Sequence, residues 1–387
     1  MEPYVTPNFR WIPVSSMHEQ KIKKMGMNEK ACWKDIFAFG GAIMAFVIGA
    51  GFATGQEVMQ FFTHLGLWRS LGAGAISMAL FAWFGATLLE DGRRLQLEDP
   101  NMIFAHYCGK WIGLFFEWFV PALMFLVVSI MLSGAGATVS EYYGADPNIG
   151  RIGMAIATLL TVLLGLKKLV HIIGAIGPVI IAFTICMGLA SILQNPGGLA
   201  TADEVLKTIE VPGAASNWVF SGILYGAFSL VGLMPFIAGM GKQARSSTDT
   251  LWGGIFGGVT FLLGGMILST GLLANIGEVY DKQVPSLVIA ASILPVVASV
   301  FAIMLLAAMY TTAVPMLWTA CNRITSDENS KKYKVGALIL IIISCFGGQL
   351  KFATMVGTVY PATGYMGLLL IVGMIYTKYL RKSQQDI

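Results

Sequence analysis

The sequence is poor in charge: only 12% of its 387 residues are Asp, Glu, Lys or Arg, against about 25% in an ordinary soluble protein. Its hydrophobic share is 56%, compared with roughly 45–50% in soluble chains. Such a chain cannot cover its apolar groups with a charged surface. The composition therefore excludes a water-soluble globule and predicts an all-α protein integral to the lipid bilayer.

Residues that build metal or catalytic centres are also scarce. The four histidines lie in the N-terminal tail or near the ends of apolar runs (His18, His64, His106 and His171). The five cysteines are not placed to form an extracellular disulfide (Cys32, Cys108, Cys186, Cys321 and Cys345). An enzyme in the membrane would need such groups clustered at depth. We therefore expect no enzyme, no cofactor and no nucleic-acid partner; the oligomeric state is left open.

Ten apolar runs are long enough to cross the membrane, which takes about 20 helical residues. They lie at 36–65, 70–90, 112–140, 149–166, 169–193, 217–240, 250–275, 295–320, 334–348 and 352–378. A shorter run at 284–293 is predicted to be a helical cap in an outer loop. The runs divide the chain into a tail (1–34), a first five-helix repeat (35–193), an outer loop (194–216), a second repeat (217–379) and a tail (380–387).

The basic residues give the orientation. With the N-terminus inside, all but five of the 25 Lys and Arg residues fall on the cytoplasmic side, the exceptions being Arg69, Arg151, Lys207, Lys282 and Lys351. Because basic loops stay in the cytoplasm, we expect a multi-pass protein of the cell membrane with both termini inside.

Glycine interrupts two of the runs at corresponding positions of the two halves. The first run contains Gly49, Gly51 and Gly55, and the sixth contains Gly226 and Gly232. Five helices per half make the repeat inverted, and paired breaks of this kind are the best sequence pointer to a transporter's binding site. The alternative is that these glycines only allow close helix packing.

A break at these positions would expose backbone groups to a ligand. The carbonyls of Ala45 and Ile48 would face a cation, and the N–H groups of Gly51 and Phe52 would face an anion. The sixth run adds aromatic walls and one hydroxyl, which suit a small amphipathic solute. The predicted substrate site comprises Gly49, Ala50, Gly51, Phe52, Thr54, Glu57, Tyr225, Phe228 and Ser229.

Residues 48–57 (IGAGFATGQE), in a chain of ten apolar runs, resemble the first helix of the YkvI-like bacterial membrane proteins, classed as amino-acid permeases. More distantly they resemble the amino acid–polyamine–organocation superfamily. The resemblance implies the LeuT-type fold, a five-plus-five inverted repeat with helices 1 and 6 broken. It further implies an alternating-access transporter of an amino acid or related small organic solute. A channel is a less favoured alternative, because no run has a continuous polar face.

Residues 308–312 (AMYTT) are similar to a sodium-site motif of sodium-coupled LeuT-type carriers. The carbonyl of Ala308 and the hydroxyls of Thr311 and Thr312 share one helical face. With the carbonyls of Ala45 and Ile48 they would give sodium five neutral oxygen ligands. The alternative is that both hydroxyls bond carbonyls of their own helix. The sodium-dependent relatives have asparagine at the position of Phe52, so a second sodium is not expected.

Glu57 has two interpretations. Thr54 and Glu57 have the S/T-x-x-E spacing of a capping box, in which Glu57 would reach back to the Thr54 N–H. A carboxylate this deep is also a candidate functional group. It would hold the amine of an amino acid or amine substrate, or carry a coupling proton. The latter would make the protein a proton-coupled amine transporter instead of a sodium symporter.

Overall fold

The computed structural model describes residues 32–164, 170–325 and 327–380, and residues 170–178 only as backbone. The described parts are helical and contain no strand, so the prediction of an all-α protein is confirmed. Most of both predicted tails lies outside the described residues. The helices are α2 (Trp33–Val47), α3 (Ala50–Ala53), α4 (Gln56–Phe61), η1 (Thr63–Leu65), α5 (Leu67–Leu95), α6 (Met102–Tyr143), α7 (Pro147–Leu164), α8 (Val170–Gln194), α9 (Pro196–Val205), α10 (Trp218–Gly241), α11 (Ser247–Ala274), α12 (Ile276–Val279), α13 (Pro285–Ile293), α14 (Pro295–Ile324), α15 (Lys331–Gly347), α16 (Phe352–Ile375) and η3 (Tyr376–Leu380).

Within the described residues, seven helices are long and apolar enough to cross a membrane: α5, α6, α7, α10, α11, α14 and α16 with η3. The end of α8 and α9 meet at an angle of 88° and would raise the number to eight if the bent pair is one span. Of the other predicted spans, the first is divided among α2, with 15 residues, and the short helices that follow it, and α15 has 17 residues, at the short end of the length that a crossing takes. A multi-spanning membrane protein is therefore confirmed, and the number ten stays a prediction.

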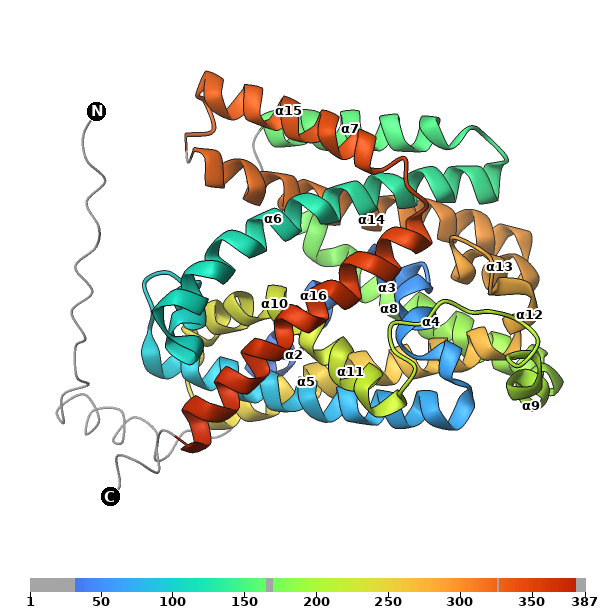
Figure 1. Cartoon of the computed structure of the whole chain (residues 1–387), viewed down its shortest axis with the longest axis horizontal. Helices are drawn as coiled ribbons and strands as arrows, with labels where there is room; N and C mark the ends of the chain where they lie inside the picture. Colours follow the sequence, from blue (N-terminus) through green and yellow to red (C-terminus); the bar gives the residue numbers. More distant parts are fainter. Residues whose placement is uncertain (1–31, 165–169, 326, 381–387) are drawn as a thin grey trace.

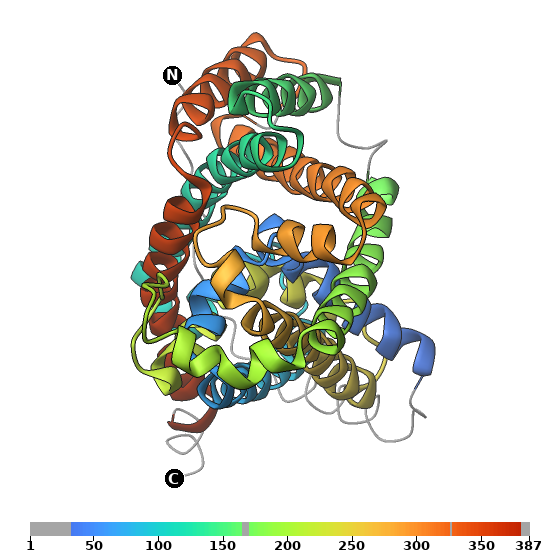
Figure 2. The same ribbon diagram turned by 90° about the vertical axis from the view of Figure 1, so that its right-hand side faces the viewer.

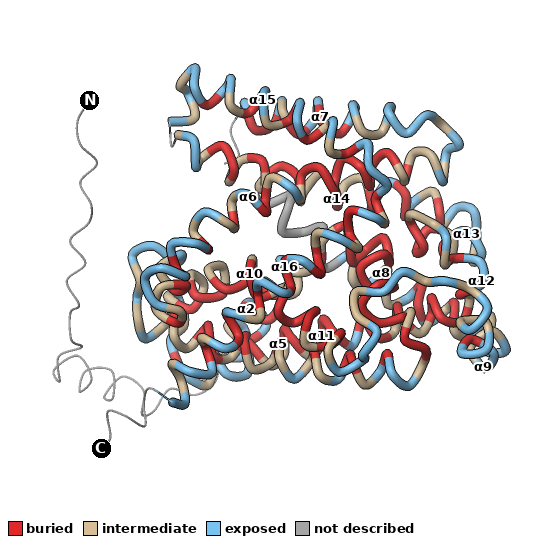
Figure 3. The backbone as a smooth tube through the Cα atoms, viewed as in Figure 1, coloured by how far each residue is buried: buried red, intermediate tan, exposed pale blue. Residues whose placement is uncertain are grey.

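The helices pack in two groups. In one, α5 lies against α10 and α11, and α11 also contacts α2. In the other, α6 packs on α14, and Figures 1 and 2 show α7 and α15 together on the outer side of this pair. Helix α16 contacts both α10 and α6 and so links the groups. The buried residues, red in Figure 3, follow the helix faces that meet in these contacts.

Glycine brings α5 and α11 unusually close together. A methyl group added at Gly254 would lie 2.1 Å from the Ala86 nitrogen and 2.3 Å from the Gly85 carbonyl carbon. No side chain fits there, because the two backbones are in direct contact. The glycines of the seventh span thus serve helix packing, as their pattern indicates.

The first span is interrupted. Helix α2 ends at Val47, and Ile48 (ψ 83°) and Gly49 (ψ 178°) lie outside the helical range. Two short helices, α3 and α4, follow, joined at Gly55 with φ of +82°. The chain therefore turns twice inside one span and presents irregular backbone at both turns.

The sixth span is not interrupted, so the prediction of a second break is wrong for this structure. Helix α10 runs continuously through Gly226 and Gly232. Gly226 instead permits contact with α5, since a methyl group there would lie 2.9 Å from the Leu80 Cδ1 atom. A glycine inside a helix costs about 1 kcal/mol, which packing against a neighbouring helix offsets.

The short apolar run after the seventh span forms helix α13, which packs on α14 and α8. This matches the predicted helical cap. Its first residues lie against the α3–α4 turn, because the Ser286 N–H donates to the Thr54 carbonyl at 3.0 Å. The loop helix thereby covers one side of the interrupted span.

Candidate functional site

The turn between α3 and α4 determines whether Glu57 can take part in a capping box. Gly55, not Thr54, is the residue that precedes α4, and no side chain caps this helix. The Thr54 hydroxyl donates to the Gly51 carbonyl at 2.9 Å. The capping box predicted as one interpretation is therefore absent, and the Glu57 carboxylate is available for other contacts.

Glu57 lies in the first turn of α4 and is only 4% exposed. Its Oε1 atom accepts a hydrogen bond from the Tyr225 hydroxyl at 2.7 Å, which joins α4 to α10. Its Oε2 atom faces Gly51: a methyl group there would lie 2.7 Å from Oε2 and 3.1 Å from the Tyr360 hydroxyl. Three separate spans thus meet at one buried carboxylate.

Aromatic rings surround Tyr225, the hydrogen-bond partner of Glu57. The Tyr225 ring lies 4.9 Å from Phe62 and 5.2 Å from Phe61, centre to centre. Phe228 stacks on Tyr360 at 4.4 Å with the ring planes 18° apart. We call this set the aromatic cage; it consists of Phe61, Phe62, Phe81, Tyr225, Phe228, Phe261 and Tyr360.

The predicted substrate residues fall into two groups. Gly51, Glu57, Tyr225 and Phe228 come together at or around the carboxylate, as described. Gly49 and Ala50 form the first turn of the interrupted span, and Phe52 packs its ring on Phe261 at 4.9 Å. The Ser229 hydroxyl is buried and has no hydrogen-bond partner among the described residues. An unpaired buried hydroxyl is costly, so Ser229 is available to a ligand.

The predicted sodium ligands show a mixed arrangement. The Thr311 and Thr312 hydroxyls both donate to the Ala308 carbonyl, at 3.0 and 2.9 Å, as the alternative interpretation requires. At the break, the Gly49 N–H donates to the Val47 carbonyl at 2.8 Å instead of continuing the helix to Ala45. The threonine oxygens keep lone pairs that could accept a cation. Within the described part of the chain, no group of three His, Cys, Asp or Glu residues could hold a metal ion.

Sequence reasoning missed a polar junction that holds the loop before α13, formed by Lys282, Gln283 and Val284. The Gln56 amide donates to the Lys282 carbonyl at 2.5 Å. The Gln283 side chain accepts from the Ala353 N–H at 2.9 Å, and the Glu141 carboxylate accepts the N–H groups of Gln283 and Val284 at 2.6 and 2.9 Å. We call these contacts the 282–284 junction; they tie α4, α6 and α16 to one loop.

One sequence signal could have indicated the junction. Gln56 and Gln60 are four residues apart in an apolar run, so they share one helix face, and their amides are hydrogen-bonded at 3.0 Å. Gln60 also donates to the Ala353 carbonyl at 2.9 Å. Tyr360, by contrast, stands in an ordinary apolar run with no motif around it.

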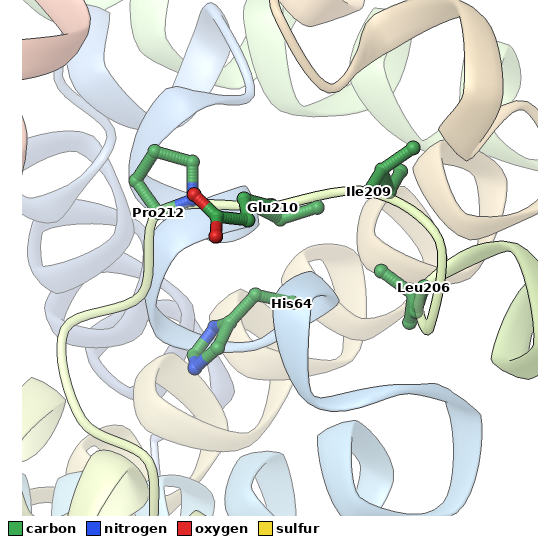
Figure 4. Close-up of a pocket in the computed structure, with 6 residues that line it drawn as sticks. His64, Leu206, Ile209, Glu210 and Pro212 are labelled. Atoms are coloured by element: carbon green, nitrogen blue, oxygen red, sulfur yellow. The ribbon is translucent and has the colours of Figure 1, made fainter.

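A surface pocket of about 490 Å³ lies over η1 and contains none of the residues around Glu57. Figure 4 shows the loop that follows α9 passing over His64. The ring of His64 contacts the Ala215 carbonyl at 2.9 Å, and the Ala214 N–H donates to the Gln60 carbonyl at 2.8 Å. This loop is therefore fastened to the end of the first span.

No protein-family model matches the chain. In sequence it is similar to the membrane protein YkvI of Bacillus subtilis, with 24% identity over 345 residues that cover 87% of this chain and 94% of YkvI. Its fold is similar to MhsT in complex with L-phenylalanine, with a TM-score of 0.57 and 18% identity over 90% of this chain and 89% of MhsT. It is also similar to the inward-facing conformation of Mhp1, with a TM-score of 0.59 and 13% identity over 89% of this chain and 76% of Mhp1.

These likenesses extend over about nine-tenths of the chain, so they include both helix groups and the interrupted span. The resemblance read from residues 48–57 is confirmed by the similarity to YkvI. The chain is an integral membrane protein with the LeuT-type transporter fold, similar in sequence to YkvI.

Proposed function

We propose that the chain is a secondary transporter that moves an amino acid or related small organic solute across the cell membrane by alternating access. The observation that carries the proposal is the interrupted first span, with Glu57 buried just beyond its second turn and hydrogen-bonded to Tyr225 of α10. Irregular backbone and an ionisable group inside a membrane protein are both features of solute sites. The transporter fold shared with MhsT and Mhp1 supports the same function.

The interrupted span also provides two helical segments that can move separately during transport. Two non-helical residues separate α2 from α3, so the halves of the span can tilt separately. Backbone N–H groups at Gly51 and Phe52 are proposed to contact the solute. The 282–284 junction fastens α4 to α6 and α16 and would close one end of the site. Opening that end requires these hydrogen bonds to break, while the α2 end stays closed.

For coupling, the first candidate is one sodium ion held by Ala45, Ile48, Ala308, Thr311 and Thr312. The Ala45 carbonyl, which the Gly49 N–H does not reach, supports this site. The second candidate is a proton carried by Glu57. A specific observation favours it: Glu57 takes part in none of the ion pairs that the structure shows among the described residues.

The test is uptake into proteoliposomes that contain the purified full-length protein. A radiolabelled panel of amino acids and amines is offered under an imposed sodium gradient or an imposed proton gradient, and protein-free liposomes give the background. We expect accumulation of at least one panel member under one of the two gradients. Equal filling with and without a gradient would indicate a channel, and no filling by any panel member would refute the proposal.

A further inference from the structure

We propose that the solute is an organic amine and that the Glu57 carboxylate binds its protonated nitrogen. This inference rests on the proposed function and names the substrate class of the same site. It distinguishes amines from zwitterionic amino acids, which carry a carboxylate beside the amine.

Glu57 has no positive charge beside it among the described residues. Tyr225 is the hydrogen-bond partner of Glu57 among the described residues, and it is neutral. A buried carboxylate without a cation is strongly unfavourable, because one hydrogen bond from a neutral hydroxyl replaces only part of its lost hydration. A cationic ligand would supply the missing charge inside the site.

The Oε2 atom of Glu57 accepts none of the hydrogen bonds found among the described residues. It lies near Gly51 and the Tyr360 hydroxyl: a methyl group added at Gly51 would lie 2.7 Å from Oε2 and 3.1 Å from the Tyr360 hydroxyl. The Tyr360 hydroxyl oxygen can accept a second hydrogen bond from an ammonium group.

The aromatic cage suits the apolar part of an amine. Phe228 lies parallel to Tyr360 at 4.4 Å and to Phe61 at 6.1 Å between ring centres, so these rings form a packed apolar wall. The same rings would hold the apolar part of the amine.

A zwitterion would also need a group that balances its carboxylate. Helices α3, α4, α10 and α16, which hold Gly51, Glu57, Tyr225 and Tyr360, contain no Lys, Arg or His. From these helices the carboxylate of an amino acid would find only neutral donors such as backbone N–H groups, and the one at Gly51 lies beside the Glu57 carboxylate. Like charges in a site of low polarity repel strongly, so the amine binds more tightly than the amino acid with the same side chain.

The experiment compares amines with the amino acids from which they differ only by the carboxylate. The pairs are phenethylamine and phenylalanine, tyramine and tyrosine, tryptamine and tryptophan, histamine and histidine, and isobutylamine and valine. Binding to the purified full-length protein is measured by thermal shift and by calorimetry. We expect at least one amine to bind at least tenfold more tightly than its amino acid.

Variants connect the result to Glu57. Glu57→Gln keeps the size of the side chain and should weaken binding of that amine at least about 100-fold. Glu57→Asp keeps the charge and should retain part of the affinity. The matched control is Glu278→Gln, the same chemical change on an exposed residue, which should bind like wild type. The melting temperature of each unliganded variant shows whether it is folded.

Each outcome is decisive. An amino acid that binds as tightly as its amine, or an amine that binds Glu57→Gln as it binds wild type, overturns the inference. Binding by no amine in the panel also overturns it. If amino acids bind and accumulate in proteoliposomes, the transporter proposal stands without the amine inference. If nothing binds and nothing accumulates, both proposals fail.

Discussion

Replacing Gly55 by alanine tests whether the turn between α3 and α4 sets the position of Glu57. Gly55 has φ of +82°, a region that L-residues with a side chain rarely adopt. The added methyl group would also lie 2.6 Å from the Ser286 hydroxyl and 3.3 Å from the Ser286 nitrogen. The substitution therefore has two effects: it strains the backbone at position 55, and it creates a steric clash with Ser286 of α13.

The two costs can be estimated separately. The left-handed conformation costs an L-residue roughly 1–2 kcal/mol. The Ser286 hydroxyl has no hydrogen-bond partner among the described residues, so it can move aside for about 0.5–1.5 kcal/mol of rotamer strain. We expect Gly55→Ala to lower the free energy of unfolding by about 1.5–3.5 kcal/mol.

The assay is an unfolding titration in mixed detergent micelles with two matched variants. Gly144→Ala has a φ of +65° and no atom within 4 Å of the new methyl group, so it should show the backbone strain alone. Adding Ser286→Ala to Gly55→Ala removes the clashing hydroxyl and should recover about 0.5–1.5 kcal/mol. If Gly55→Ala is as stable as wild type, or if Ser286→Ala recovers nothing, the proposed geometry of the turn is refuted.

Three further predictions concern the sodium site, the junction and the topology. The double variant Thr311→Ala and Thr312→Ala should lose sodium-stimulated uptake and still insert; unchanged stimulation would mean that the hydroxyls serve only their own helix. In a cysteine-free background, Glu141→Gln should speed thiol labelling of a cysteine at the buried position Ser286, because it weakens two hydrogen bonds to the 282–284 junction; equal rates in both backgrounds would contradict this. Cysteines at Asp203 and Asp281 should label from outside intact cells, and one at Asn329 only after permeabilisation; labelling of Asn329 in intact cells would rule out the expected orientation.

Much of the fold could be predicted, because a helix that crosses the bilayer needs a long apolar run that is visible in the sequence. The apolar run at 295–320 corresponds to α14, Pro295–Ile324, and the run at 70–90 to α5, Leu67–Leu95. Whether α10 is broken could not be determined from its glycine pattern. A glycine is needed both where a helix unwinds and where two helices touch, and only the neighbouring Leu80 shows which applies at Gly226.

The candidate site was predictable in parts. Residues 48–57 indicated an interrupted span, and Glu57 was an obvious candidate by its depth. Its partner was not predictable, because Glu57 and Tyr225 are 168 positions apart in the sequence and meet only through packing. The same holds for Tyr360, which comes from the last span. Local spacing instead suggested the capping box with Thr54, which the left-handed Gly55 prevents by taking the position before α4.

The absence of that cap strengthens the functional interpretation of Glu57. A carboxylate that capped α4 would stabilise the fold, and its burial would need no other explanation. In this structure Glu57 caps no helix, forms none of the ion pairs among the described residues, and is nonetheless 4% exposed. Burying a charge without a counter-charge costs free energy, so a neutral residue of similar volume would be less costly at this position. Stability alone would thus favour a neutral residue at this position, and a charged ligand explains why a carboxylate occupies it.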